Sequence, residues 1–151
     1  MIYLLVSIII FNLIAFFIPK RLSKIEMYTI SIFSMLFAIC TDVILDLKYH
    51  LYWYFSIEPD WKSFIILFGT YPSVAIIYLN YFPFTSDRRK KIIYILWWSV
   101  FVTLFEWGTF VAEILHYRKW NIVYSAVTYP LILAVVYWNF LWIRKLARSS
   151  R

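Results

Sequence analysis

Glycine and cysteine are scarce in this chain, which has two glycines and one cysteine among its 151 residues. With only Gly69 and Gly108, the sequence lacks a glycine-rich loop of the kind that cradles phosphates. The single thiol, Cys40, cannot form an intramolecular disulfide, and its place in an apolar run indicates a small buried hydrophobe. The spacing of the residues indicates neither a thiolate metal motif nor a Ser-His-Asp arrangement.

Acidic residues are also few, with eight against fifteen lysines and arginines and a net charge of +7. The basic residues form short clusters between apolar runs, which is typical of cytoplasmic loops and not of a nucleic-acid-binding face. We therefore expect the lipid bilayer as partner, with anionic lipids at the basic clusters, and no nucleic acid. No basic residue precedes the first apolar run, so we expect no cleavable signal peptide, and there is no lipidation motif.

Apolar side chains dominate the composition, at 64% hydrophobic and 23% aromatic residues. A soluble domain is about half apolar, and a domain this small cannot hide the excess in a core of its own. Five runs approach the roughly 20 residues that a helix needs to cross a bilayer. They are residues 2–18, 27–45, 63–82, 92–115 and 122–143. The sequence predicts one all-α membrane domain, residues 1–151, with five transmembrane helices.

The distribution of basic residues predicts the orientation of these helices. The tail and two of the loops between runs carry eleven basic residues, namely Lys20, Arg21, Lys24, Arg88, Arg89, Lys90, Lys91, Arg144, Lys145, Arg148 and Arg151. The other two loops carry four, which are Lys48, Lys62, Arg118 and Lys119. The positive-inside rule then places the N-terminus outside and the C-terminus in the cytoplasm. Pro72 and Pro130 lie within the third and fifth runs, and each predicts a kink.

Runs two and three resemble runs four and five, which suggests a repeat of two helices. Each pair follows a basic cluster, carries acids late in its first helix, and contains Thr-Tyr-Pro at residues 70–72 or 128–130. Each then ends on Tyr-x-Asn-aromatic, at residues 78–81 or 137–140. Coincidence in a tyrosine-rich chain is the alternative interpretation. A parallel repeat about an axis along the membrane normal would place the two groups of acids face to face.

Acidic residues inside the predicted spans are the main functional signal, because such charges are costly and usually face a bundle interior or a wet cavity. Asp42 and Glu106 are predicted to lie roughly 22–26 Å from the cytoplasmic side, in the outer leaflet of a core about 30 Å thick. At helical spacing they begin two stripes, Asp42, Asp46 and Tyr49, and Glu106, Glu113 and Tyr117. We predict an outward-opening polar pocket with aromatic walls from Trp53, Trp107, Tyr71 and Tyr129.

The loop from residue 46 to residue 62 adds further polar side chains at the same side, namely Lys48, His50, Glu58, Asp60 and Lys62. Its segment KYHLYWYF is amphipathic, so we expect a short helix along the outer membrane surface. Glu113-x-x-His116 puts two potential metal ligands on one helical face, as in di-iron carboxylate bundles. Asp42, Asp46 and His50 are candidates to complete such a metal site.

Each of these residues also has a plainer interpretation. Asp46, Lys48, Glu113 and His116 are close enough to water to be ordinary interface residues, and the aromatic rings can simply pack helices or meet lipid. An ion pair of Asp42 or Glu106 with Arg118 would be structural. Three functions remain compatible with the sequence. They are small-ligand or cation binding, including transport; a membrane-embedded carboxylate and histidine enzyme with or without a metal ion; and a structural subunit, including a homo-oligomer.

Several motifs carry a family resemblance. They are Asp42 and Asp46-Leu-Lys-Tyr, Tyr78-Leu-Asn-Tyr-Phe-Pro, Phe105-Glu-Trp, Trp120 with Tyr124-Ser125, and Tyr129-Pro130. In these the chain resembles a group of small multi-pass membrane proteins of Gram-positive endospore-forming bacteria, over most of its length after the first helix. The resemblance implies a bacterial cytoplasmic membrane and carries over no activity. The tryptophan-rich sensory proteins share the five helices, but their Pro- and Trp-rich loop motif is absent here.

Overall fold

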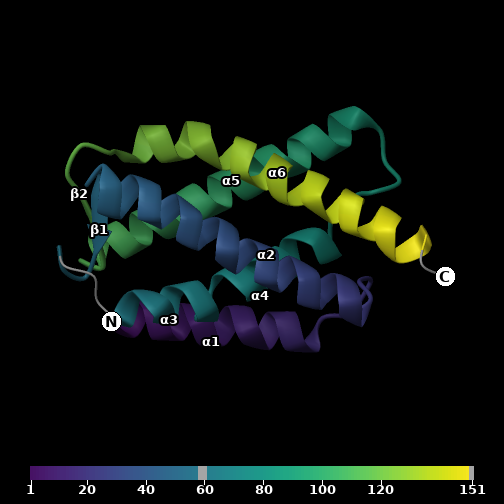
Figure 1. Cartoon of the computed structure of the whole chain (residues 1–151), viewed down its shortest axis with the longest axis horizontal. Coiled ribbons are helices and arrows are strands. Elements are labelled where there is room, and N and C mark those ends of the chain that lie inside the picture. The colour runs from purple at the N-terminus through teal and green to yellow at the C-terminus, as the bar shows by residue number, and fades with distance from the viewer. Residues whose placement is uncertain (58–60, 150–151) are drawn as a thin grey trace.

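Helices make up most of the computed structural model, which describes residues 1–57 and 61–149 (Figure 1). The elements are α1 Ile2–Phe17, α2 Lys24–Asp42, the π-helix η1 Val43–Lys48, β1 Tyr52–Tyr54, α3 Lys62–Gly69, α4 Tyr71–Asn80, α5 Arg88–Val111, β2 Leu115–Tyr117 and α6 Ile122–Ser149. In this part of the chain four helical segments are long and apolar enough to cross a membrane, Lys24–Lys48, Lys62–Asn80, Arg88–Val111 and Ile122–Ala147. The apolar helix α1 is shorter. The described part of the chain is therefore mainly helical, with segments suited by length and composition to cross a membrane.

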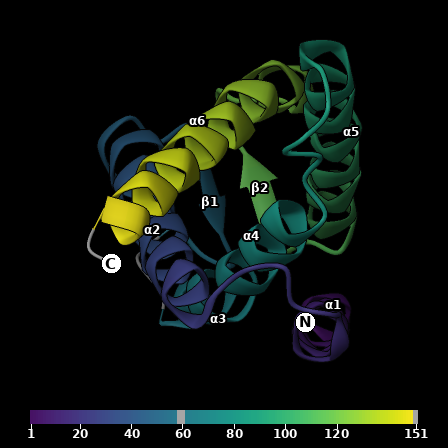
Figure 2. The same ribbon diagram turned by 90° about the vertical axis from the view of Figure 1, so that its right-hand side faces the viewer.

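The helices run along the length of the molecule, and their direction alternates along the chain except that α4 continues in the direction of α3 (Figure 1). Both strands lie at the end of the bundle that holds the N-terminus. The α1–α2 loop, the α4–α5 loop and the end of α6 lie at the opposite end. The most extensive helix pairs are α5 with α6 and α2 with α4. Viewed from the C-terminal end, the two strands are seen between α2, α4, α5 and α6 (Figure 2).

Side-chain caps set the starts of two of these helices. Ser23 and Glu26 form a capping box at α2, in which Ser23 Oγ accepts a hydrogen bond from Glu26 N and Glu26 Oε2 accepts one from Ser23 N, at 3.3 and 2.7 Å. Asn121 precedes α6, and its Oδ1 accepts hydrogen bonds from the backbone N–H groups of Val123 and Tyr124 at 3.0 and 3.1 Å. These caps satisfy first-turn donors that have no partner within a helix.

The two prolines within the apolar runs have different consequences. The third run is broken at Thr70, between the end of α3 and the start of α4, and Pro72 is the second residue of α4. At that position the missing N–H costs no helical hydrogen bond. Pro130 instead lies inside α6, which continues without interruption. The irregularity predicted for the third run is therefore a helix break, whereas the fifth run is one helix.

The end of the fourth run differs from the prediction. Helix α5 ends at Val111 and not at residue 115, because Glu113 adopts a left-handed backbone conformation with φ 55°. Ile114 N then donates to Thr109 O at 3.0 Å, which closes the helix end in the manner of a Schellman motif. The predicted helical stripe through Glu106, Glu113 and Tyr117 is therefore wrong, since only its first residue lies in the helix.

The loop after α2 forms a strand and not the surface helix that its amphipathic pattern suggested. Strand β1 pairs antiparallel with β2, and the paired residues are Tyr52 with Tyr117, Trp53 with His116 and Tyr54 with Leu115. Pairing with a segment more than 60 residues away satisfies the backbone groups that a helix would have satisfied locally. The two loops at this end of the bundle are thus joined into one small sheet.

The interior contains two buried apolar clusters. The larger one consists of Leu22, Ile30, Ala75, Tyr78, Leu79, Phe82, Leu133, Val136 and Phe140, and the smaller one of Leu4, Ile66 and Ile114. Asn80 bridges α4 to the α1–α2 loop, since its amide group accepts from Arg21 N at 2.8 Å and donates to Pro19 O at 3.0 Å. Cys40 is exposed on α2 and not buried as predicted, because the buried side of that helix carries Ile30, Ser34 and Ala38.

Candidate functional site

A cavity of about 210 Å³ lies inside the bundle, bordered by residues of both apolar clusters. Asp42 of α2 and Glu106 of α5 both line it. It is also lined by the hydroxyl-bearing side chains of Ser34, Thr41, Tyr52, Tyr54, Thr70, Tyr71, Tyr78, Thr109, Tyr117, Ser125, Thr128 and Tyr129. Among the described residues, no lysine, arginine or histidine lines it. Two acids from different membrane helices therefore share one cavity without a basic partner.

Glu106 is the centre of a hydrogen-bonded cluster and is only 8% exposed. Its Oε1 accepts from Ser125 Oγ at 2.6 Å and from the Tyr117 hydroxyl, and its Oε2 accepts from the Tyr129 hydroxyl. Trp120 Nε1 donates in turn to Ser125 Oγ at 2.8 Å. Three hydroxyl donors thus replace the water that an exposed carboxylate would have, which stabilises a carboxylate in a buried place.

Asp42 lines the same cavity but has a separate hydrogen-bond donor. Its Oδ1 accepts a hydrogen bond from the Tyr52 hydroxyl at 2.6 Å. Tyr54 and Tyr71 also line the cavity that the two acids share. Tyrosines therefore surround both acids.

Two of the three strand tyrosines, Tyr52 and Tyr117, are held in their protonated form. Burial, and next the Asp42 carboxylate, raise the pKa of Tyr52 far above its usual value of 10.0. Burial, and next the hydrogen bond to Glu106, raise the pKa of Tyr117 in the same direction. A hydroxyl that stays protonated at every physiological pH remains a hydrogen-bond donor. Tyr52 and Tyr117 are therefore permanent donors to the acids.

The small sheet positions these donors. Side chains alternate between the two faces of a strand, so Tyr52 and Tyr54 of β1 face the cavity together with Leu115 and Tyr117 of β2. Trp53 and His116 belong to the opposite face and stack on each other, with ring centroids 5.6 Å apart and an interplanar angle of 18°. The sheet, which supplies four of the residues that line the cavity, lies at the end of the bundle near the N-terminus (Figure 1).

The π-helix η1 begins directly after Asp42 and changes the direction of the side chains that follow. Tyr49 N donates to Ile44 O, five residues earlier, at 3.1 Å. Because a π-helix has a wider turn than an α-helix, the α-helical stripe predicted through Asp42, Asp46 and Tyr49 does not form. Tyr49 is 54% exposed, and neither it nor Asp46 lines the cavity. Single turns of π-helix occur frequently at functional sites.

Several other predicted site residues lie away from the cavity. Trp107 is 56% exposed on α5, and Glu113, His50 and Arg118 are also exposed. His116 stacks on Trp53 and shares no helical face with Glu113, so the geometric argument for a metal site at this pair is wrong. Within residues 1–57 and 61–149 no three His, Cys, Asp or Glu side chains are grouped so that they could hold a metal ion. Glu58 and Asp60 lie outside the described residues.

Of the predicted ligand-binding residues, Asp42, Glu106, Tyr71 and Tyr129 line the cavity. The sequence reasoning did not find Tyr52, Thr70 or Ser125 as members of the site. Tyr52 follows Asp42 by ten residues, and Tyr117 follows Glu106 by eleven. Tyr52 and Tyr117 therefore follow the two acids at nearly the same distance in the chain, whereas the predicted stripes contained Tyr49 and Tyr117. Thr70 belongs to the first Thr-Tyr-Pro and Ser125 to the motif of Trp120 with Tyr124-Ser125, but neither pattern predicted that these residues belong to the site.

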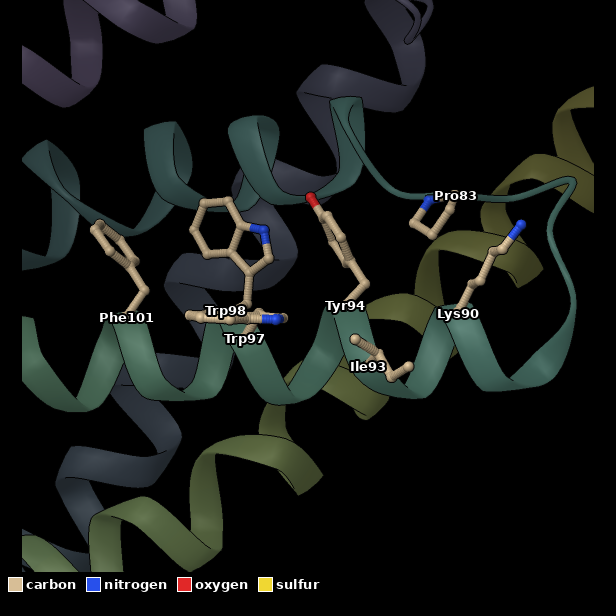
Figure 3. A pocket seen from close by; sticks show the side chains of 7 residues that line it. All are labelled: Pro83, Lys90, Ile93, Tyr94, Trp97, Trp98 and Phe101. Atoms are coloured by element: carbon tan, nitrogen blue, oxygen red, sulfur yellow. The ribbon is translucent and has the colours of Figure 1, made fainter.

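A second hollow, of about 510 Å³, lies on the surface of α5 (Figure 3). It is lined by Pro83, Lys90, Ile93, Tyr94, Trp97, Trp98 and Phe101. Tyr94 and Trp98 project from α5 toward α4, where the Tyr94 hydroxyl donates to Tyr78 O at 2.8 Å. Its walls are apolar apart from Lys90 at one end, as expected for a helix surface that faces lipid. It lacks the convergent polar groups of the interior cavity and is not a candidate site.

Comparisons with known proteins do not indicate what the cavity binds. No family model, no curated protein and no solved structure matches the chain. The resemblance to small multi-pass proteins of endospore-forming bacteria therefore stays a prediction. The function must follow from the geometry and chemistry of the two acids and their surroundings.

Proposed function

We propose that the protein is an integral membrane protein that binds a small organic cation, preferably an amine, between Asp42 and Glu106. The observation that carries the proposal is that both acids line one cavity in which no described basic side chain is present. Two carboxylates at membrane depth repel each other, and such groups are normally paired with a cation. A bound cation supplies the missing positive charge.

The other walls of the cavity favour an organic cation over a metal ion. Tyrosine rings offer faces on which an ammonium group is attracted by the ring quadrupole. Tyr52, Tyr54, Tyr71 and Tyr129 all line the cavity, and the hydroxyls of Tyr52 and Tyr129 donate to the two acids. A volume of about 210 Å³ is below the roughly 300–1,000 Å³ of sites for drug-sized molecules. The ligand is therefore small and mainly apolar around its charged group.

The two acids have different roles in this proposal. A carboxylate offers about four acceptor positions, and three hydroxyls already donate to Glu106. Asp42 receives one described hydrogen bond, from Tyr52. Asp42 is therefore the direct partner of the ligand ammonium group, and Glu106 adds negative potential while its own hydrogen bonds stay in place.

Asp42→Asn is expected to weaken amine binding by about tenfold or more, because a charged hydrogen bond contributes roughly 1.5–3 kcal/mol. The measurement is isothermal titration of the detergent-solubilised protein with 2-phenylethylamine, with sodium and potassium ions as further probes. Asparagine keeps the size of the side chain and can still accept from Tyr52, so a loss of affinity reports the charge.

Asp46→Asn is the matched control for this experiment. It removes the same charge only four residues away, at a position that does not line the cavity. Its amine affinity is expected to equal that of the wild type. Equal losses in both variants, or wild-type protein that binds neither the amine nor an alkali cation, would contradict the proposed function. Transport, catalysis and a purely structural role stay predictions.

We further infer that the chain crosses the membrane five times, with the N-terminus outside and the C-terminus in the cytoplasm. The three segments rich in basic residues lie at the same end of the bundle (Figure 1), as the positive-inside rule requires of cytoplasmic loops. Helix α1 has 16 residues, about 24 Å in length. It crosses a core of about 30 Å if the bilayer thins locally. A bacterial cytoplasmic membrane remains the expected location.

Cysteine labelling tests this topology, after Cys40 is replaced by serine. A cysteine at Lys119 is expected to react in intact cells with a maleimide that does not cross membranes. A cysteine at Arg89 is expected to react only after the cells are permeabilised. The reverse pattern would contradict the orientation, and labelling of both positions in intact cells would contradict the number of crossings.

We also infer that the two halves of the bundle are copies of one two-helix unit. Supporting this, each acid accepts a hydrogen bond from a tyrosine of the strand that follows it, Asp42 from Tyr52 and Glu106 from Tyr117. These two tyrosines lie opposite each other in an antiparallel pair, which has local two-fold symmetry. An experimental structure in which the halves do not superpose, with Pro72 on Pro130, would contradict the repeat.

A further inference from the structure

One buried hydroxyl of the cavity has no partner. Thr70 lies at the break between α3 and α4, is 6% exposed and lines the cavity. Its Oγ1 makes no hydrogen bond within the described protein. Buried polar groups are nearly always hydrogen-bonded, so an unsatisfied hydroxyl that faces a cavity indicates that something else fills its bonding position.

The other threonines in the helices show that this is exceptional. Their hydroxyls donate to a backbone carbonyl three or four residues earlier, at 2.7–2.8 Å, and these residues are Thr29, Thr41, Thr103, Thr109 and Thr128. This local bond is the usual solution for threonine in a membrane helix. Thr128 is the informative comparison, because it begins the second Thr-Tyr-Pro and donates to Tyr124 O.

The helix break explains why Thr70 differs from Thr128. Thr70 has φ −105° and ψ −52°, outside regular helical geometry, whereas Thr128 lies in the uninterrupted α6. A threonine hydroxyl in a helix donates to the carbonyl three or four residues earlier, which for Thr70 belongs to Leu67 or Ile66. Ile66 O accepts the Thr70 backbone N–H at 2.9 Å, but the Thr70 hydroxyl bonds to neither carbonyl. The break therefore leaves the Thr70 hydroxyl available to a ligand.

Thr70 lines the same cavity as the two acids, Asp42 and Glu106. A ligand whose cationic group binds Asp42 therefore lies in the same cavity as the Thr70 hydroxyl. In membrane transporters, sites at broken helices commonly supply polar groups to a ligand in this way.

We propose that Thr70 hydrogen-bonds a second polar group of the ligand, and that the ligand class is small amines bearing a neutral hydroxyl or carbonyl group. This inference rests on the proposed amine site. The second group is neutral because a ligand carboxylate would be repelled by two acids with no described basic side chain beside them. Amino alcohols belong to this class, and amino acids do not.

The test uses two probes that differ by one hydroxyl, 2-phenylethylamine and 2-amino-1-phenylethanol, titrated into the detergent-solubilised full chain. The wild type is expected to bind the amino alcohol about fivefold more tightly, as one additional hydrogen bond provides. In Thr70→Val this preference disappears while the affinity for 2-phenylethylamine is unchanged. In Thr70→Ser the preference is retained.

Thr103→Val is the matched control, because its hydroxyl already donates to Ser99 O and it does not line the cavity. It is expected to keep the fivefold preference. Thr70→Val is expected to melt no earlier than the wild type, since its hydroxyl has no protein partner to lose. Equal affinity of the wild type for the two probes, or an unchanged preference in Thr70→Val, would overturn the inference and leave the amine site standing. Failure of both probes to bind the wild type would overturn both.

Discussion

Glu106→Leu is expected to lower the free energy of unfolding by about 3 kcal/mol, because one buried and two partly buried hydroxyls lose their acceptor at once, and each unsatisfied buried group costs roughly 1–3 kcal/mol. Leucine matches the size of the side chain but accepts no hydrogen bond. Removal of a buried charge acts in the opposite direction, since burial of an ion is itself costly. The net effect on the free energy of unfolding is a loss, because Ser125, Tyr117 and Tyr129 all remain in place without their acceptor.

Thermal unfolding in detergent, followed by tryptophan fluorescence, measures this effect. Glu106→Gln keeps one acceptor oxygen and is expected to cost less than leucine. Adding Tyr129→Phe to Glu106→Leu is expected to restore part of the stability, because it removes one of the orphaned hydroxyls. Glu113→Leu is the matched control at an exposed position, with an effect within about 0.5 kcal/mol. If Glu106→Leu melts no earlier than this control, the hydrogen-bonded cluster does not stabilise the bundle.

Arg144→Ala is expected to cost about 3 kcal/mol, because it leaves a buried carboxylate without its cation. Arg144 Nε lies 2.7 Å from Glu26 Oε1, and Glu26 is 7% exposed. The guanidinium group also lies over the rings of Phe84 and Phe140, 4.5 Å from each centroid. The arginine therefore joins the C-terminal part of α6 to the start of α2 and to the α4–α5 loop.

Two variants distinguish the contribution of the ion pair to stability from that of the stacking on the rings. Arg144→Lys keeps the charge but loses the planar stacking on the rings, so an intermediate loss is expected. Adding Glu26→Gln to Arg144→Ala is expected to recover stability, since it removes the unpaired charge while keeping an acceptor for Ser23 N. Lys145→Ala, at the exposed neighbouring residue, is the control. An Arg144→Ala variant as stable as Lys145→Ala would contradict a stabilising ion pair.

The membrane helices could be predicted well from the sequence because the signal for them is local. The predicted run 27–45 corresponds to the helical segment Lys24–Lys48, and 122–143 corresponds to Ile122–Ala147. Any helix that crosses lipid must be apolar along its whole length. The capping residues Ser23 and Asn121 lie just outside these runs and are local as well. Length and composition are therefore sufficient for these elements.

The strands and the end of α5 could not be predicted in this way. Strand β1 exists because residues 52–54 meet residues 115–117, and no periodicity within either segment indicates a partner so far along the chain. The left-handed conformation of Glu113 is usually a glycine position at helix ends, so its sequence predicts continuation of the helix. Tertiary contacts overrode the local preference in both places.

By itself, the sequence determined that two carboxylates, Asp42 and Glu106, lie late in two membrane helices, where an unpaired charge is costly. Only the tertiary structure decided that they share a cavity, because this depends on how α2, α5 and the small sheet pack together. It also decided which hydroxyls serve them, through the pairing of β1 with β2 and the start of α6. The free hydroxyl of Thr70 follows from the helix break, since the same Thr-Tyr-Pro in α6 leaves no hydroxyl free.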